Sequence, residues 1–159
     1  MLFNSFEFIF LFLPVTWVLF WILMRWTEPR FALAWLVASS LFFYGWWSWQ
    51  YVFILVGSAV FNFGISRMLF ATARGASRRR LVLIVGIAAN LAVLGYFKYA
   101  NFFIENLREL VAVDWNLGAV ILPLGISFYT FQQIAYLVDV YRDVCPRYTL
   151  MQYLGFVTF

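Results

Sequence analysis

Residues 31–66 read FALAWLVASSLFFYGWWSWQYVFILVGSAVFNFGIS, and none of these 36 side chains is charged. As one helix the run would be about 54 Å long at 1.5 Å per residue, whereas the hydrocarbon core of a bilayer is about 30 Å thick. The run must therefore fold back. Trp and Tyr collect at the membrane–water boundary, so the cluster YGWWSWQY at 44–51 marks the turn. The stretch predicts two consecutive membrane spans, at about 31–46 and 51–66.

The whole chain of 159 residues has the same character, with 65% hydrophobic, 23% aromatic and 11% charged residues. A soluble domain is about 45–50% apolar and about 25% charged, so this chain has too few polar residues to cover a water-facing surface. Disorder is also excluded, because it requires low hydrophobicity. The expected fold class is an all-α polytopic transmembrane helical protein surrounded by the lipid bilayer. The net charge is +4, and the cations are scattered among apolar runs. This pattern indicates cations that set the orientation of membrane spans, and it argues against nucleic-acid binding.

Three further spans are predicted, at about 6–24, 81–97 and 120–138. The first carries a single charge, at Glu7. No cation precedes it and no small-residue cleavage site follows Met24, which favours an uncleaved helix over a signal peptide.

The remaining segments are shorter or more polar. Five arginines in the fourteen residues 67–80 predict a polar connection between spans. Apolar residues at helical spacing within 98–114 predict an amphipathic, interfacial helix. A new helix is expected at 149–159, capped by Thr149. Since the ten residues 150–159 that follow the cap cannot span a bilayer, we expect this chain to be the N-terminal transmembrane portion, 1–159, of a single larger domain.

Orientation follows from counting Lys and Arg on the two sides of these spans. Nine cations lie on one side, namely Arg25, Arg30, Arg67, Arg74, Arg78, Arg79, Arg80, Arg142 and Arg147, and Lys98 and Arg108 lie on the other. Cytoplasmic loops are enriched in cations, so the N-terminus is predicted outside the cytoplasm and 67–80 inside it. The single cysteine, Cys145, is then a cytoplasmic thiol without a disulfide partner in this chain.

The most informative segment is 122–142, LPLGISFYTFQQIAYLVDVYR. At 100° per residue, a polar stripe occupies an arc of about 120° and consists of Tyr129, Gln132, Gln133, Tyr136, Asp139 and Asp143. The opposite face is predicted to hold Ser127, Phe131, Ile134, Ala135, Leu137 and Val138. Unsatisfied polar groups in lipid are costly, so the stripe must face protein or a hydrated cavity. Two interpretations remain open: interhelical hydrogen bonds, or the wall of a substrate tunnel.

Two local features accompany the stripe. Pro123 and Gly125 predict that the helix starts or kinks just ahead of it, because proline lacks the amide hydrogen that a helix interior needs. Asp139 and Arg142 are three residues apart and are predicted to pair at the cytoplasmic boundary.

Other polar or small residues carry weaker predictions. Asn62 and Asn90 lie inside spans and are predicted to form hydrogen bonds between helices. A strip for close helix packing is predicted from Ala88 and Ala92, with Gly86 and Gly95 nearby. The triplet Arg78–Arg80 is interpreted as an anchor at anionic headgroups, or alternatively as a contact for an anionic donor such as a coenzyme A thioester. The sequence contains no histidine, no Gly-rich phosphate loop and no Cys/His metal spacing.

Several of these stretches resemble one known family. LPLGISFYTFQQIAYLVDVYR is similar to the signature stretch of the membrane-bound O-acyltransferases, in their bacterial polysaccharide-acetylating branch. MLFNSFEFIFLFLPV at 1–15, LVASSLFFYGWWSWQYVFIL at 36–55 and LGYFKYANFF at 94–103 also resemble segments of that family. The resemblance runs in order along nearly the whole chain.

The resemblance implies an integral membrane enzyme of the bacterial inner membrane. It would move an acyl group, here acetyl, from a cytoplasmic donor, acetyl-CoA or another acyl thioester, to an acceptor at the outer face. The acceptor would be an exported polysaccharide such as alginate, or a periplasmic acetyltransferase partner. D-alanyl and peptidoglycan acyltransferases share similar segments and remain alternatives, as does a multi-span transporter component.

The resemblance also limits what this chain can supply. The family's catalytic histidine belongs to a later region, and this chain has no histidine, so no catalytic residue, bound cofactor or metal ligand is expected here. The expected contribution is a scaffold and part of the substrate path. The candidate residues for that path are Tyr129, Gln132, Gln133 and Tyr136.

Overall fold

The computed structural model describes residues 5–111 and 122–158, with the side chains of 47 and 100–111 left out. The chain divides into two compact units, the first formed by 1–64 and 146–159 and the second by 65–145. Every regular element in the described ranges is helical, which confirms the all-α prediction.

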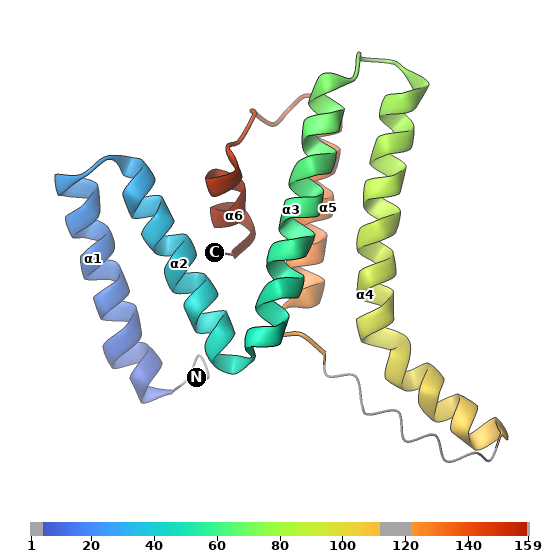
Figure 1. The fold of residues 1–159 in the computed structure, drawn as a ribbon, viewed down its shortest axis with the longest axis horizontal. Helices are drawn as coiled ribbons and strands as arrows, with labels where there is room; N and C mark the ends of the chain where they lie inside the picture. Colours follow the sequence, from blue (N-terminus) through green and yellow to red (C-terminus); the bar gives the residue numbers. More distant parts are fainter. Residues whose placement is uncertain (1–4, 112–121, 159) are drawn as a thin grey trace. The chain divides into compact units, whose positions relative to one another are not determined.

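The described residues form one π-helical turn and six α-helices. In chain order they are the π-helical turn η1 (Phe8–Phe12), α1 (Leu13–Trp26), α2 (Pro29–Trp47), α3 (Trp49–Ala71), α4 (Ser77–Val111), α5 (Ile126–Tyr141) and α6 (Leu150–Thr158) (Figure 1). In the described residues, three segments are long and apolar enough to cross a membrane: Phe8–Trp26, Trp49–Ala71 and Ser77–Tyr99. The protein is therefore a membrane protein with several spans.

In the first unit, α1 and α2 lie side by side and run in opposite directions (Figure 1). The break between them ends at Pro29, the first residue of α2, where the missing amide hydrogen costs no hydrogen bond. The Trp35 indole N–H donates to the Thr16 carbonyl of α1 at 3.1 Å. The rings of Phe8 and Phe43 approach to 4.8 Å between centroids, which attaches η1 to the same pair.

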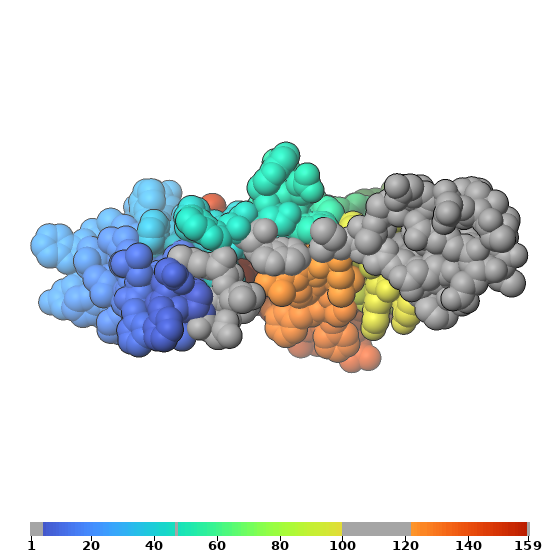
Figure 2. All heavy atoms as spheres, turned by 90° about the horizontal axis from the view of Figure 1, so that it is seen from below, coloured from blue at the N-terminus to red at the C-terminus, as the bar shows by residue number. Residues whose placement is uncertain are grey.

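Helix α1 packs on α2, yet none of its residues is buried. Many of its large apolar side chains are exposed; Trp17, for example, is 65% exposed. Figure 2 shows part of this apolar surface as the blue spheres of α1. Such a surface is stable in lipid and not in water, so α1 has the surface of a membrane span.

Helix α6 packs on α2 in the same unit. Its start is a capping box, because the Gln152 N–H donates to Thr149 Oγ1 at 3.3 Å and the Thr149 N–H donates to Gln152 Oε1 at 2.9 Å. The predicted helix start at Thr149 is confirmed. Gly155 allows close contact with α2, since a Cβ atom there would lie 2.9 Å from Leu33 Cδ1.

The connection between α3 and α4 is shorter than the sequence predicted. Helix α3 continues to Ala71 and α4 begins at Ser77, so only residues 72–76 connect them, with Gly75 at a φ of +80°. Most of the arginines of 67–80 are consequently helical residues. Long arginine side chains can place their charge at the membrane boundary from within a helix end, so the cation-rich sequence did not require a loop.

Helix α4 also differs from its prediction. The interfacial helix expected at 98–114 is not separate, because α4 runs without interruption from Ser77 to Val111; residues 112–114 lie outside the described ranges. Figure 1 shows a change of direction in the C-terminal part of α4. The small-residue prediction holds at Gly86, which is buried, whereas Ala88 and Ala92 are exposed.

Candidate functional site

Helix α5 begins where the sequence predicted a start. Pro123 is buried, Gly125 has the left-handed backbone (φ 70°, ψ 9°) that favours glycine, and Ile126 is the first helical residue. The helix has 16 residues and ends at Tyr141, three residues beyond the predicted span at 120–138. At 1.5 Å per residue it is about 24 Å long, which is shorter than the hydrocarbon core.

Helix α5 has a packed face against α4, and much of that face is polar. Its buried residues are Ile126, Tyr129, Thr130, Gln133, Tyr136, Leu137 and Val140. Gln133 is fully buried and Tyr136 is 2% exposed. A helix that buries an amide and two phenols inside protein is unlike a span with the apolar surface of α1.

The observed face is rotated from the predicted polar stripe by about 60° at 100° per residue. Three of the four path candidates, Tyr129, Gln133 and Tyr136, lie on the buried face, and Gln132 is half-buried beside it. Three assignments were wrong. Asp139, predicted on the stripe, is exposed, and Asp143, also predicted there, lies beyond the end of α5. Leu137, predicted on the opposite face, is fully buried.

The rotation has a packing cause in the contact with α4. A Cβ atom at Gly86 would lie 2.8 Å from Leu137 Cδ1 and 3.0 Å from Ile65 Cγ2, so Leu137 occupies space that the absent side chain of Gly86 leaves open. The side chain of Leu137 fills the space over Gly86. Periodicity of polar residues on α5 alone could not show this, because the complementary position lies 51 residues earlier, on α4.

The polar side chains reach neighbouring helices and their own backbone. The Tyr136 hydroxyl donates to Ser66 Oγ of α3 at 3.5 Å, and both residues are buried. In α4, Asn90 is 4% exposed and its Nδ2 donates to the Gly86 carbonyl one turn earlier at 2.7 Å. The second unit thus contains a layer of hydroxyl and amide groups within helices of membrane composition. Such groups can orient a hydroxyl or an ester by hydrogen bonding.

A second polar feature lies where α5 ends. Tyr141 is the last helical residue, and Asp143 has a positive φ of 60°. The Asp143 N–H donates to the Val140 carbonyl at 3.1 Å and the Val144 N–H donates to the Asp139 carbonyl at 3.0 Å. These two bonds form a Schellman motif, with an aspartate where glycine is usual.

Arg79, in the first turn of α4, binds this motif. Its guanidinium donates from Nη2 to Asp143 Oδ1 at 2.7 Å and from Nη1 to Oδ2 at 3.1 Å, a bidentate pair. Nη2 also donates to the Val140 carbonyl at 3.1 Å, and the guanidinium carbon lies 5.4 Å from the centre of the Tyr141 ring. Arg74, from the α3–α4 connection, reaches the same carboxylate with Nε 2.8 Å from Oδ2.

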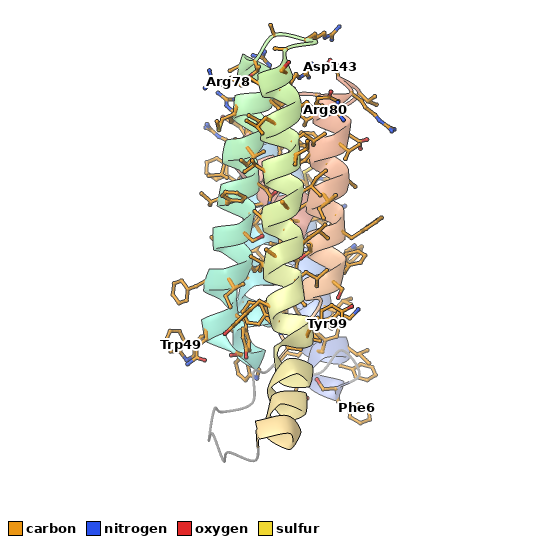
Figure 3. The ribbon with its side chains drawn as sticks, turned by 90° about the vertical axis from the view of Figure 1, so that its right-hand side faces the viewer. Phe6, Trp49, Arg78, Arg80, Tyr99 and Asp143 are labelled. Atoms are coloured by element: carbon orange, nitrogen blue, oxygen red, sulfur yellow. The ribbon has the colours of Figure 1, made fainter. Side chains whose placement is uncertain are left out.

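The arginine triplet is therefore not uniform. The Arg79 side chain is only 5% exposed, whereas Arg78 and Arg80 are exposed. Figure 3 shows Arg78, Arg80 and Asp143 at one end of the second unit, with Tyr99 toward the other end of α4. The prediction that the triplet anchors at headgroups is wrong for Arg79, which is packed inside protein.

The predicted pair between Asp139 and Arg142 does not form in the described part of the chain. The carboxylate that pairs is Asp143, and its partners come from α4 and the α3–α4 connection. Spacing within one helix could not reveal an ion pair between positions 64 residues apart. The hydrogen bond from Arg79 holds the pKa of the Asp143 carboxyl below its usual value, although its partial burial acts in the opposite direction.

Comparisons with known proteins extend over almost the whole chain. A peptidoglycan O-acetyltransferase of Helicobacter pylori is 45% identical over 144 residues, which are 90% of this chain and 27% of that protein. A probable alginate O-acetylase of Pseudomonas aeruginosa is 37% identical over 162 residues, with coverage of 99% and 30%. Its namesake in Pseudomonas putida is 34% identical, with coverage of 99% and 33%.

The chain thus spans about a third or less of the length of these relatives. No family model and no solved structure matches the sequence. The chain is 34–45% identical to these O-acetylating proteins over nearly all of its residues, which shows that it is homologous to them. The chain belongs to the membrane-bound O-acyltransferase family.

Proposed function

We propose that this chain is part of a bacterial inner-membrane O-acetyltransferase that modifies an exported polysaccharide. The observation that carries the proposal is the similarity along 90–99% of the chain to relatives named for O-acetylation of peptidoglycan or alginate. These relatives are named as O-acetylating enzymes and not as transporters. The comparisons therefore give no support to the alternative of a multi-span transporter component.

The reaction moves an acetyl group from an activated donor to a sugar hydroxyl. The hydroxyl oxygen attacks the thioester carbonyl of a cytoplasmic donor such as acetyl-CoA, a C–O bond forms, and the thiolate leaves. A general base must take the hydroxyl proton. This chain has no histidine, and its buried face offers phenols and amides, so we assign it a role in orienting substrate. The base and the final transfer to the acceptor, directly or through a periplasmic acetyltransferase partner, would come from elsewhere.

Two acceptors are candidates, because the relatives differ in the polymer that their names give. Alginate is the first candidate, because several relatives are named as probable alginate O-acetylases. Peptidoglycan is the second candidate, because a relative named as a peptidoglycan O-acetyltransferase is 45% identical to this chain. Both polymers present hydroxyl groups on pyranose rings outside the inner membrane. A deletion strain in which the ester-linked acetate of each polymer is measured would separate the two.

The substrate-path assignment predicts a distinctive pattern on α5. Gln133→Leu and Tyr136→Phe in the full-length protein should reduce acetylation per molecule, because both remove hydrogen-bonding atoms from the buried face while keeping its volume. Gln132→Leu should have a smaller effect, since Gln132 is half-buried. The measurement is ester-linked acetate on the polymer, normalised to the amount of protein in the membrane.

The matched control is the exposed side of the same helix, where Phe128 is 71% and Phe131 is 74% exposed. Phe128→Leu and Phe131→Leu should leave turnover per molecule unchanged. Loss of one interhelical hydrogen bond averages only about 0.6 kcal/mol in membrane proteins, so a purely structural role predicts small, equal effects on both faces. Equal effects would refute the substrate-path assignment and leave the family unaffected.

The topology is a separate prediction, with the N-terminus in the periplasm and the arginine-rich end of the second unit in the cytoplasm. It rests on the division of nine cations against two. Ser77 is exposed at the start of α4, so Ser77→Cys provides a single reporter in a background from which Cys145 and any other cysteine of the full-length protein have been removed. In intact cells the thiol should resist a membrane-impermeant reagent and react after lysis. Labelling before lysis would reverse the orientation and the donor side with it.

A further inference from the structure

The Arg79–Asp143 pair at the end of α5 combines two features that each cost free energy. A charged guanidinium with 5% exposure has lost most of its hydration, which costs free energy that only good hydrogen bonds offset. Asp143 also adopts a left-handed backbone, which a residue other than glycine adopts at some cost. Two unfavourable features coincide at one contact between α4 and α5, and the surrounding contacts determine both.

We propose that Arg79 and Asp143 are positioning residues that fix the rotation and the axial position of α5 against α4. Through that restraint they place the buried polar face, with Tyr129, Gln133 and Tyr136, in the substrate path. This inference rests on the proposed function. Neither residue is assigned contact with substrate.

The hydrogen-bond geometry supports restraint rather than simple neutralisation. Arg79 binds the Asp143 side chain through two nitrogens and the Val140 main-chain carbonyl through one of them. Three acceptor atoms at defined positions orient a rigid, planar guanidinium, and the guanidinium in turn fixes both the last turn of α5 and the residue after it. Lysine, a compact point charge, could neutralise Asp143 without reproducing this orientation.

The pair is also in line with the face that it would position. Arg79 Nη2 donates to the carbonyl of Val140, which is a buried residue of the last turn of α5 and follows Tyr136 by one turn on the same buried face. Leu137 is held against Gly86 on that side. A change of rotation at the Arg79 contact would therefore move Gln133 and Tyr136 directly.

The first test measures the position of α5 without any assay of activity. Gly86→Cys with Leu137→Cys places two thiols across the α4–α5 contact, in a background from which Cys145 and any other native cysteine have been removed. Leu137→Cys removes the methyl group that a Cβ at 86 would meet. Oxidative cross-linking in membranes is expected to be efficient in the parent protein. Arg79→Gln, Arg79→Lys and Asp143→Asn should each lower its yield.

Asp143→Asn is informative because asparagine tolerates the left-handed backbone and removes only the charge. The controls are Arg78→Gln and Arg80→Gln, which remove the same charge from adjacent exposed positions and should leave the yield unchanged. If a single variant is not produced, Arg79→Gln combined with Asp143→Asn takes its place, because the double variant leaves no lone buried charge.

The second test separates positioning from binding in the full-length enzyme. A displaced polar face should lower kcat by about tenfold to a hundredfold, with the KM for the acyl donor unchanged, since small misplacements act on the reacting geometry. Arg79→Lys should fail to rescue kcat. The control variants Arg78→Gln and Arg80→Gln should keep the kcat of the parent enzyme.

Three results would overturn the proposal. A raised KM with unchanged kcat would make Arg79 a contact for an anionic donor. Normal kcat per molecule with reduced abundance would make the pair purely structural. A cross-linking yield and kcat equal to those of the Arg78→Gln control would remove any role. If the parent protein acetylates no polymer, the proposed function fails, and the cross-linking result still decides whether the pair holds α5.

Discussion

Helices α1 and α5 are both apolar in composition, yet they meet different surroundings. Helix α1 buries none of its fourteen residues, whereas α5 buries seven of sixteen, including two tyrosines, a threonine and a glutamine. A helix that faces lipid can accept almost any apolar side chain. The protein-facing helix requires particular neighbours, such as Gly86 beneath Leu137 and Arg79 beside Asp143.

The difference indicates where specificity resides in this part of the protein. Apolar surface gains little from contact between helices in a bilayer, because lipid tails are as apolar as leucine. Tight packing and buried hydrogen bonds must therefore determine how α5 is placed, and α1 needs only to span. Substitutions should accordingly be tolerated on α1 and costly on α5.

The largest effect is expected from Leu137→Ala. Leu137 is fully buried against α4, so its truncation leaves a cavity and removes van der Waals contacts. Large-to-small substitutions in well-packed cores cost about 2–5 kcal/mol, and we expect a value in that range. Thermal unfolding of the purified full-length protein in detergent would measure it.

Leu19→Ala on α1 is the paired substitution, since Leu19 is 36% exposed. Detergent or lipid can fill the space left by its side chain, so the free energy of unfolding should change by less than about 0.5 kcal/mol, as at other exposed positions. A loss at Leu19 as large as that at Leu137 would show that α1 is covered by protein, and the comparison would fail.

The sequence alone predicted much of this architecture, because hydrophobic length, aromatic boundaries and breakers act locally. The helix start at Thr149 and the break before Ile126 follow from capping and from Pro123 and Gly125, which need no tertiary information. The predicted loop at residues 67–80 was wrong because the local sequence does not determine this structure. Cations predict proximity to water, but they do not distinguish a loop from the end of a long helix.

Within the candidate site, the polar residue types were predicted better than the face that carries them. Tyr129, Gln133 and Tyr136 are buried as expected, because polar groups cannot face lipid. Leu137 and Asp139 were misplaced because the true face depends on shape, and the decisive partner is an absent side chain at Gly86. No pattern in the sequence around Arg79 or Asp143 indicated that these two residues pair.

A smaller effect is expected from Gly86→Ala. Its counterpart in the same helix, α4, is Gly95→Ala, so the two variants compare a packed and an open position of one helix. The new methyl group would lie 2.8 Å from Leu137 Cδ1 and 3.0 Å from Ile65 Cγ2, so α5 or these side chains must shift. Overpacking of this kind costs about 1–3 kcal/mol, toward the lower end here because Leu137 Cδ1 ends a flexible side chain. Gly95, also in α4, has no atom within 4 Å of an added Cβ, so Gly95→Ala should stabilise α4 by about 0.5–1 kcal/mol through helix propensity. Thermal unfolding of both variants should therefore give shifts of opposite sign. Shifts of the same sign would mean that α5 does not pack on α4 through Gly86, and the distinction between the two faces of α4 would be lost.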